Sequence, residues 1–334
     1  MDRGKIYTFP TLTGEMSIEN TGKILPHEHL VIFPSDFCSE NYDEIKQHYI
    51  PIYKKLVEEY NCNVIAEMSP RLNADGLSAR GLSIKKNEQI ELYKEICVKS
   101  GMNLVLSTGF YREVKRPAYF FESCISSLAD EMICDIEHGI GGTGVKAGII
   151  KVAVDDINSP ADLKLIEAAA IAQKATGVSI TTHTCTPEIR LNTLNLLERA
   201  GVDPQRICLG HADTNASASE LLSLAQRGCN FLLTIWGITD GATIGMPGTL
   251  PKMHSANLSS ALVENGYIDQ LLISIDYAAE ITDGKLSPAL YNIPERSSLY
   301  AFTFAVPALK ELNITDGQIN KITVDNPRKM LAKL

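Results

Sequence analysis

Several features that commonly reveal a protein's class are missing from this sequence. No stretch approaches the roughly 20 consecutive apolar residues that a membrane-spanning helix requires, and the N-terminal residues lack the apolar core of a secretory signal. Acidic residues outnumber basic ones by 40 to 31, which gives a net charge of −9. Because no basic stripe is present to neutralise phosphates, a nucleic-acid-binding protein is disfavoured. These absences predict a cytoplasmic protein that acts on a small molecule, with neither nucleic acid nor a membrane as partner.

Two common motifs are also absent. The eight cysteines are scattered and none forms a Cys-x-x-Cys pair, which disfavours a thiolate zinc site and leaves free thiols as the expectation. Only Cys185 lies near a candidate site, and no base pattern marks it as a nucleophile. No Gly-x-Gly-x-x-Gly motif follows the first predicted strand, and the glycine-rich segment 139–144 precedes a strand. That segment is therefore predicted to be a turn rather than a nucleotide-binding loop.

Short apolar runs alternate with longer amphipathic stretches along the whole chain, 45% of which is hydrophobic. Most of these runs are rich in Val, Ile and Leu without strict polar alternation, as in parallel strands that are covered on both faces. The eight predicted strands are Lys23–Pro26, Asn63–Met68, Asn103–Ser107, Ala147–Val154, Val178–Thr182, Arg206–Gly210, Asn230–Ile235 and Gln270–Ile275.

Helical patterns separate the predicted strands. They cover Phe121–His138, Asp162–Thr176, Glu188–Ala200, Ser217–Arg227 and Asn257–Glu264, and a glycine follows most of them as a stop signal. Strand–helix alternation indicates a parallel sheet, and eight units favour a closed (β/α)8 (TIM) barrel that takes up residues 1–334 as one α/β domain. Two long connections, Gly237–Ser255 and Tyr277–Glu295, are predicted to lie over the C-terminal mouth of the barrel.

Side chains that bind metals occur in five of the predicted strands. His27 and His29 are two residues apart at the end of the first strand, so they share one face while Glu28 takes the other. The remaining candidates are Lys151 within the fourth strand, His183 at the end of the fifth, His211 at the end of the sixth and Asp276 at the end of the eighth. A barrel brings the carboxyl ends of all its strands to one mouth, so these side chains are predicted to meet there.

The chemistry of this set points to more than one metal ion. Four imidazoles and a carboxylate suit zinc, manganese or cobalt. A single catalytic zinc usually keeps three protein ligands, whereas a set of this size suits two ions about 3.5–4 Å apart. A protonated lysine cannot coordinate, so two interpretations of Lys151 remain: a barrel lysine paired with a carboxylate, or an amine that has reacted with CO2 to give a bridging carbamate.

Taken together and in this order, the motifs resemble the phosphotriesterase family of the amidohydrolase superfamily. The matching residues are His27-x-His29, Ala147-Gly-Ile-Ile-Lys151, Thr181-Thr-His183-Thr, Ile207-Cys-Leu-Gly-His211 and Ser274-Ile-Asp276, together with 14–29, 107–111, 137–151 and 324–328. The resemblance covers most of the chain and implies a barrel with a binuclear metal centre at its C-terminal mouth. Since many family members pair as dimers, it also leaves a homodimer open.

The resemblance implies a role for each ligand. The inner metal would be held by His27, His29 and Asp276, the outer metal by His183 and His211, and N6-carboxylated Lys151 would bridge the two. Zinc is the leading metal, with manganese and cobalt as alternatives. A hydroxide shared by the ions would be the nucleophile, and Asp276 would be catalytic, accepting its proton and passing it to the leaving group.

The mouth of this chain departs from the family. Organophosphate-hydrolysing members have a histidine at the end of the seventh strand and lactone-hydrolysing members often have an arginine, whereas Trp236 stands there in this sequence, either as a wall for the substrate or as a cap on the core. Tyr111 matches a tyrosine that lactone-hydrolysing relatives place over the substrate, with packing as the alternative. Arg112, Lys115, Lys252 and Arg296 fall in mouth loops, as phosphate-binding cations or as solvated charges.

The sequence therefore predicts a metal-dependent hydrolase that acts on an ester-type bond, with a lactone, which could be a phosphorylated sugar lactone, as the leading substrate. Phosphotriester or phosphodiester hydrolysis and hydrolysis of an N-acyl amide are the enzymatic alternatives, because the same centre attacks any activated carbonyl or phosphoryl group. A non-catalytic binding protein that retains the metal site is the alternative of another class. The presence of every expected ligand argues against it.

Overall fold

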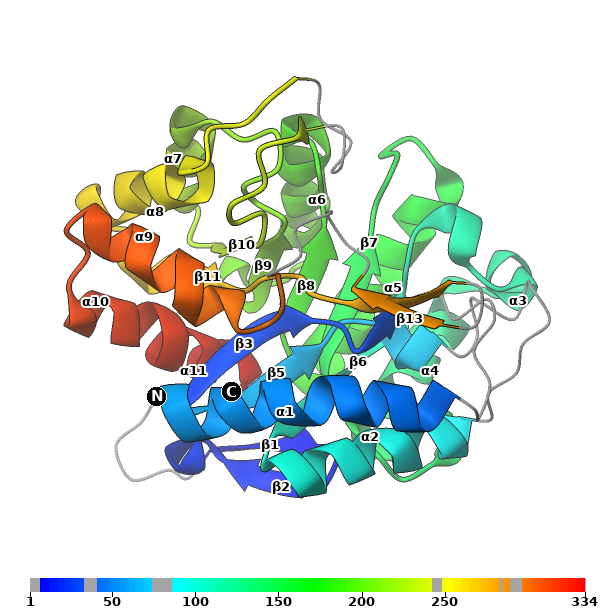
Figure 1. The fold of residues 1–334 in the computed structure, drawn as a ribbon. Helices are drawn as coiled ribbons and strands as arrows, with labels where there is room; N and C mark the ends of the chain where they lie inside the picture. The colour runs from blue at the N-terminus through cyan, green and yellow to red at the C-terminus, as the bar shows by residue number, and fades with distance from the viewer. Residues whose placement is uncertain are drawn as a thin grey trace.

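The computed structural model describes residues 7–32, 41–73, 86–241, 248–282, 285–288 and 296–333. Its centre is a set of eight parallel strands (Figure 1). These strands are β3 (Lys23–Glu28), β5 (Cys62–Glu67), β6 (Asn103–Phe110), β7 (Ala147–Ala153), β8 (Ile180–His183), β9 (Ile207–Gly210), β10 (Asn230–Leu233) and β11 (Leu271–Ile273). All eight strands predicted from the sequence are confirmed, with ends displaced by at most a few residues.

The strands pair in the order in which they follow one another along the chain, from β3 to β11. Backbone hydrogen bonds just beyond the ends of these two outer strands bring them together: Asp276 N donates to His27 O at 3.1 Å, and His29 N donates to Tyr277 O at 2.8 Å. The sheet therefore curls into a nearly closed barrel, as predicted. The joint between its first and last strands is made by the residues that were predicted to bind the inner metal.

Helices cover the outside of the barrel (Figure 1). They are α1 (Tyr42–Tyr60), α2 (Lys86–Ser100), α3 (Ala118–Glu122), α4 (Ile125–Glu137), α5 (Pro160–Thr176), α6 (Pro187–Arg199), α7 (Ala218–Ala225), α8 (His254–Glu264), α9 (Val306–Glu311), α10 (Asp316–Asn320) and α11 (Asn326–Leu331). The single helix predicted over Phe121–His138 is wrong, because the backbone is extended at Ser123 and Cys124 and divides α3 from α4. None of the described helices combines the length and the apolarity needed to cross a membrane.

Two apolar clusters stabilise the barrel. The larger one fills the space between the strands and the helices. The smaller one fills the barrel interior with one or two side chains from most strands, among them Ile24, Val64, Val105, Ile149 and Leu272. Because side chains alternate along a strand, Lys151 follows Ile149 on the inner face of β7, one layer nearer the mouth.

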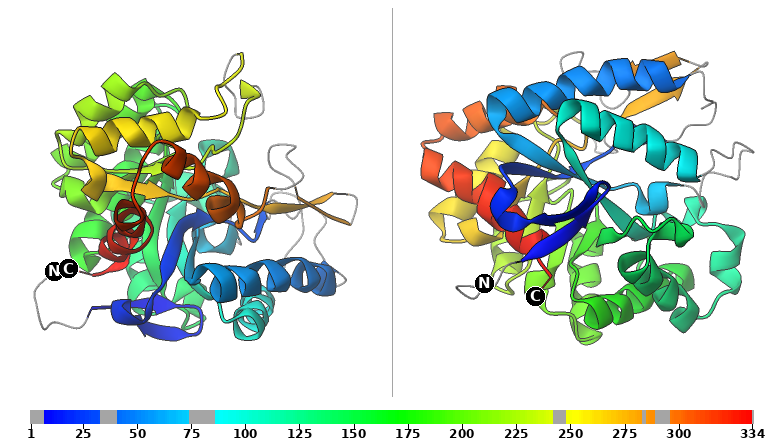
Figure 2. Two further views of the ribbon diagram at one scale, coloured as in Figure 1. Left: turned by 60° about the vertical axis from the view of Figure 1, so that its left-hand side comes forward. Right: turned by 90° about the horizontal axis from the view of Figure 1, so that it is seen from below.

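The opposite end of the barrel is plugged by the two ends of the described chain. A hairpin of β1 (Thr8–Thr11) and β2 (Gly14–Ser17) lies beside α11 there (Figure 2). Phe9 from the hairpin and Leu331 from α11 belong to the interior cluster, and Leu12 N donates to Leu104 O near the start of β6. Apolar side chains therefore fill this end of the barrel interior, and Lys151 lies toward the other end.

The two long connections are partly described. After β11, the chain forms β12 (Ala279–Thr282) and β13 (Lys285–Pro288), and β12 pairs in parallel with β4 (Val31–Ile32), which begins two residues after His29. After β10, the connection ends where α8 begins at His254. Residues 242–247, 283, 284 and 289–295 of these connections lie outside the described part of the chain.

Candidate metal centre

The inner-metal ligands predicted from the sequence meet at the joint between β3 and β11. Asp276 Oδ1 lies 3.4 Å from His27 Nε2 and 3.3 Å from His29 Nε2, so one carboxylate oxygen faces both imidazoles. All three side chains are buried. Two atoms that coordinate the same zinc ion, each about 2.0–2.2 Å from it, lie about as far apart as Asp276 Oδ1 lies from the two Nε2 atoms. The spacing therefore fits one ion between them.

The remaining predicted ligands surround this cluster. His211 Nδ1 lies 3.8 Å from Asp276 Oδ2, and the His211 ring is 4.7 Å from the His27 ring and 4.5 Å from the His183 ring, measured between centroids. Lys151 Nζ approaches His27 Nε2 at 3.3 Å and the carbonyl oxygen of Thr182 at 3.4 Å. The structure thus brings all six predicted side chains together, and ligand atoms of His27, His211 and Asp276 lie within 4.8 Å of one another.

Burial controls the charge of most of these groups. It lowers the pKa of His27 and His183 well below the usual range and lowers the pKa of His211 to about 4. These imidazoles are therefore neutral at pH 7, which is the form that coordinates a metal. Burial also lowers the pKa of Lys151 to about 8, so roughly a tenth of its amine is neutral at pH 7 and able to react with CO2.

Two ligands depart from this pattern because they face each other. Burial alone would lower the pKa of His29, but hydrogen bonds to Asp276 and Glu67 outweigh it and raise that pKa to about 9. Burial alone would raise the pKa of Asp276, but His211, His29 and His27 hold it well below its usual range. Without a metal, the pair is therefore a protonated imidazole beside a carboxylate.

Buried partners behind the ligands fix the orientation of two rings. His29 Nδ1 lies 2.9 Å from Ser69 Oγ and 3.6 Å from Glu67 Oε1, which leaves Nε2 directed at Asp276. His211 Nδ1 lies 2.8 Å from the hydroxyl of Thr234. Such contacts would select the ring nitrogen that binds the ion.

Two of the ligands have an unusual backbone. His211 and Asp276 adopt left-handed conformations with φ of 54° and 55°, which cost free energy for residues other than glycine. His211 directly follows β9 and Asp276 lies three residues beyond β11, so the turn out of each strand aims the side chain across the mouth. Strained residues of this kind persist only where their surroundings hold them in place. At both positions, a buried charged side chain from another part of the chain does so.

Sequence reasoning missed the two side chains that hold these turns. Arg190 on α6 is fully buried and donates to the carbonyl groups of Thr184, His211 and Thr214 while pairing with Glu220 at 2.9 Å. Glu28 was expected only to take the face of the strand opposite to the two histidines. Its carboxylate accepts four hydrogen bonds from the segments around Asp276. The sequence signal that could have revealed them was a charged residue, a glutamate or an arginine, at a position expected to be buried.

Two of the predicted mouth residues are part of the protein interior. Trp236 is 1% exposed, and its indole nitrogen donates to Leu233 O at 3.1 Å. Arg296 is 2% exposed and donates to the carbonyl groups of Trp236, Thr234 and Ile275. The placement of Trp236 matches the cap-on-the-core alternative, and Arg296 ties the ends of β10 and β11 together.

The other four predicted mouth residues lie nearer to solvent, and Lys115 among them is half-buried. The Tyr111 ring stands edge-on to the His183 ring with centroids 5.3 Å apart, and burial raises the pKa of its phenol. The Arg112 side chain is 49% exposed and pairs with Asp155, with Nε 2.9 Å from Oδ1. Lys252 is exposed, and its Nζ lies 5.1 Å from the centroid of the Phe304 ring. Of the six, Tyr111 is the residue that the structure places against a ligand.

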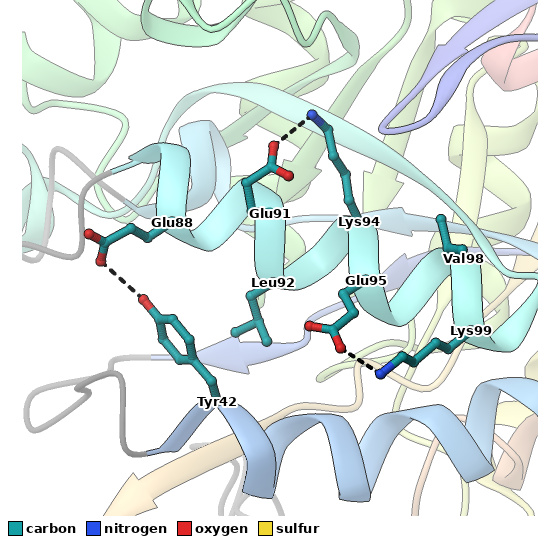
Figure 3. A pocket seen from close by; sticks show the side chains of 8 residues that line it. All are labelled: Tyr42, Glu88, Glu91, Leu92, Lys94, Glu95, Val98 and Lys99. Atoms are coloured by element: carbon teal, nitrogen blue, oxygen red, sulfur yellow. Dashed lines mark hydrogen bonds and ion pairs between the residues drawn. The ribbon is translucent and has the colours of Figure 1, made fainter.

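A groove on the outer wall offers a contrast to this centre. It runs between α1 and α2, has a volume of about 680 Å³, and is lined by Tyr42, Leu92, Val98 and several charged residues (Figure 3). The charged side chains pair along α2, as Lys94 with Glu91 at 2.9 Å and Lys99 with Glu95 at 2.6 Å. Paired surface charges of this kind are solvated and contribute little, so the strand ends are the candidate site.

The donor set itself fits divalent metal ions. Three buried imidazoles, the half-buried imidazole of His183, a carboxylate and a lysine amine lie together at the end of an otherwise apolar barrel interior, where unpaired polar groups are costly. In addition, His27 Nδ1 is a buried nitrogen for which no hydrogen-bond partner is found among the described residues. Coordination would offset this cost and would also neutralise the Asp276 carboxylate.

Comparisons with known proteins agree with this centre. The sequence profile described as the phosphotriesterase family matches residues 7–331. An aryldialkylphosphatase from Saccharolobus solfataricus is 30% identical over 96% of this chain and 99% of its own length. More distantly, the human N-acetyltaurine hydrolase is 23% identical over 96% of this chain and 97% of its own. The solved structure of an organophosphorus hydrolase from Deinococcus radiodurans superposes with a TM-score of 0.82 at 26% identity, covering 98% of each chain.

Proposed function

The chain belongs to the phosphotriesterase family of hydrolases, and from that premise we propose that it is a metal-dependent hydrolase whose substrate is a lactone. The observation that carries the choice of substrate is the placement of Tyr111 edge-on to His183, beside the outer half of the centre. The buried phenol keeps its proton at physiological pH because its pKa is raised. It can therefore donate a hydrogen bond to an oxygen of the ester group without carrying charge.

The residues of the centre divide the work as follows. His27, His29 and Asp276 would hold an inner ion, His183 and His211 an outer ion, and carboxylated Lys151 would connect the two. Zinc is the first choice for both ions, with manganese and cobalt as alternatives. Bound there, the ions would lower the pKa of the attacking water and polarise the bond under attack.

Asp276 is the group that moves the proton. Its carboxylate stays ionised at neutral pH because the surrounding imidazoles hold its pKa low. It can therefore accept a proton from the attacking water and deliver it to the alkoxide oxygen that leaves when the ring opens. The hydrogen bonds around residues 275–277 fix the direction of this carboxylate relative to His27 and His29.

Phosphotriester hydrolysis is the second candidate, and the name of the relative from Saccharolobus solfataricus favours it. The position after β10 favours neither candidate, because Trp236 stands where organophosphate-hydrolysing members have a histidine and lactone-hydrolysing members often have an arginine. Trp236 is buried with its indole bonded to Leu233, so this position contributes no titratable group to the mouth. A phosphate on the lactone would have to be recognised by Lys252 or other loop residues, since Arg296 is engaged by three carbonyl groups and Arg112 by Asp155.

A substrate panel tests the proposal. Metal-free protein is reconstituted with Zn²⁺, Mn²⁺ or Co²⁺ in bicarbonate buffer and assayed against simple lactones, phosphorylated sugar lactones, an aryl dialkyl phosphate and N-acyl amino acids. We expect the highest kcat/KM for a lactone. A higher kcat/KM for the phosphate triester or the amide would replace the lactone with that substrate class. Turnover of none of them by metal-loaded protein would favour a non-catalytic binding protein.

A further inference from the structure

Glu28 stands between the two histidines of the first strand, yet it belongs to the other side of the barrel joint. Its side chain is fully buried, and the four hydrogen bonds that its carboxylate accepts come from residues that follow β11. Oε1 accepts hydrogen bonds from Ser274 Oγ and Ile275 N, each at 2.7 Å. Oε2 accepts hydrogen bonds from Tyr277 N at 3.1 Å and Ser298 Oγ at 2.8 Å.

These contacts bracket Asp276. The two backbone N–H groups that Glu28 binds belong to the residues immediately before and after Asp276, whose own backbone is in the left-handed conformation. Ser274 Oγ, bound to Glu28, in turn accepts a hydrogen bond from His27 N at 3.1 Å. One carboxylate therefore connects the turn that carries Asp276 to the strand that carries the two histidines.

We propose that Glu28 is a positioning residue for the inner metal: it sets the turn at 275–277 so that Asp276 faces His27 and His29 at the separation that one ion requires. The inference rests on the two-metal centre proposed above and adds a residue that does not itself coordinate. It explains why a charged residue occupies a fully buried position that an apolar residue could fill. The four hydrogen bonds then place Asp276 in addition to closing the barrel.

The substitution Glu28→Gln is the sharpest test. Glutamine keeps the size of the side chain but replaces one acceptor oxygen with an NH2 donor. In either orientation of the amide, this donor faces a backbone N–H, that of Ile275 or that of Tyr277, and two donors cannot bond to each other. The turn must then move, and Asp276 moves with it.

The matched control is Asp135→Asn. Asp135 on α4 is also a buried carboxylate with three donors around it: Thr108 Oγ1 at 2.6 Å, Arg71 Nε at 3.0 Å and Gly141 N at 3.1 Å. It has no contact with a predicted ligand among the interactions described above. A variant that loses only barrel stability should resemble this control.

Metal-free wild type and both variants are titrated with Co²⁺ in bicarbonate buffer, following the visible absorption of the bound ion and competition with a chelator. Wild type should bind two ions. Glu28→Gln should bind one of them about 10- to 100-fold more weakly, with an altered Co²⁺ spectrum, because changes behind a ligand typically cost that much affinity. Asp135→Asn should lower the melting temperature and leave both affinities and the spectrum as in wild type.

Each other outcome has one meaning. Two Co²⁺ affinities unchanged in folded Glu28→Gln, or an equal loss in Asp135→Asn, would overturn the positioning role and leave Glu28 a purely structural residue. Absence of Co²⁺ binding by wild type would instead reject the proposed metal centre. If Glu28→Gln does not fold, Ser298→Ala decides, since it removes one bond and keeps the carboxylate. It should weaken the same ion by a smaller factor, and an unchanged affinity there would overturn the proposal.

Discussion

The strand ends and the loops that follow them hold their side chains in different ways. At the strand ends, Asp276 and His211 are buried. Their turns are fixed by hydrogen bonds, in which Arg190 donates to the His211 carbonyl group and Glu28 accepts from Ile275 N. In the loops, Lys252 is exposed and Arg112 is half exposed in a surface ion pair. The barrel thus places the reacting groups on rigid positions and leaves recognition to positions that tolerate change. Substitutions at the strand ends should therefore alter turnover, metal binding or stability, whereas substitutions in the loops should mainly alter the choice of substrate.

Asp276→Asn should give the largest effect on the chemistry. The amide can no longer accept the proton of the attacking water, so kcat for the best substrate should fall by about 10²–10⁴-fold, the usual contribution of a general base. Kinetics combined with metal analysis of the same samples makes the measurement, because the loss must be seen in protein that still contains metal. Turnover close to wild type in the metal-loaded variant would remove Asp276 from the proton path.

Two arginines, both predicted from the sequence to lie in mouth loops, allow the comparison to be made in terms of stability. Arg296→Met removes three hydrogen bonds to buried carbonyl groups and should lower the free energy of unfolding by about 3 kcal/mol or more. Arg112→Ala breaks an exposed ion pair and should cost less than about 1 kcal/mol. Urea unfolding of the metal-free proteins measures both. Equal losses would contradict the distinction between a structural and a surface cation.

The pH dependence of metal binding distinguishes His29 from the other three histidine ligands. In the metal-free protein the pKa of His29 is raised to about 9, so below pH 9 this ring carries a proton that an incoming ion must displace. The other three imidazoles are neutral at pH 7 because their pKa values are lowered. Affinity for the inner Co²⁺ should therefore fall about tenfold for each unit of pH below 9 for this one proton, measured by titration at pH 7, 8 and 9. A pH-independent affinity would contradict a charged His29.

The same raised pKa sets the sign of a stability effect in the metal-free protein. A group whose pKa is higher in the folded state stabilises that state below its unfolded pKa, near 6.5 for histidine, and the stabilisation is lost as the pH rises through the folded value. The contribution of His29 should therefore disappear between about pH 6.5 and 9. The contribution of His29 should thus make the metal-free protein less stable at pH 9 than at pH 6.5, measured by urea unfolding at both pH values.

What could be predicted from the sequence follows the same division. Strand ends were predictable because apolar runs give the strands, and the barrel dictates where their last residues meet. His27, His183 and Asp276 could thus be assigned to one mouth although they are far apart in the sequence. Loop residues have no such rule, so Arg296 was expected at the mouth and lies in the interior. Glu28 and Arg190 were missed as holding residues because their roles depend on backbone groups of other strands, which no local pattern encodes.

Tyr111→Phe tests a loop residue whose ring packs against a ligand, and its effect should be the smallest. The ring remains against His183, so the packing and the metal affinities should stay as in wild type. Only the hydroxyl is lost, and one neutral hydrogen bond of about 1 kcal/mol corresponds to a roughly 5- to 10-fold lower kcat/KM for lactones. Tyr60→Phe on α1, whose ring stacks on Phe302 away from the centre, is the control and should change nothing. If Tyr111→Phe left kcat/KM for lactones unchanged, Tyr111 would be a packing residue, and substrate choice would pass to the loops beyond it.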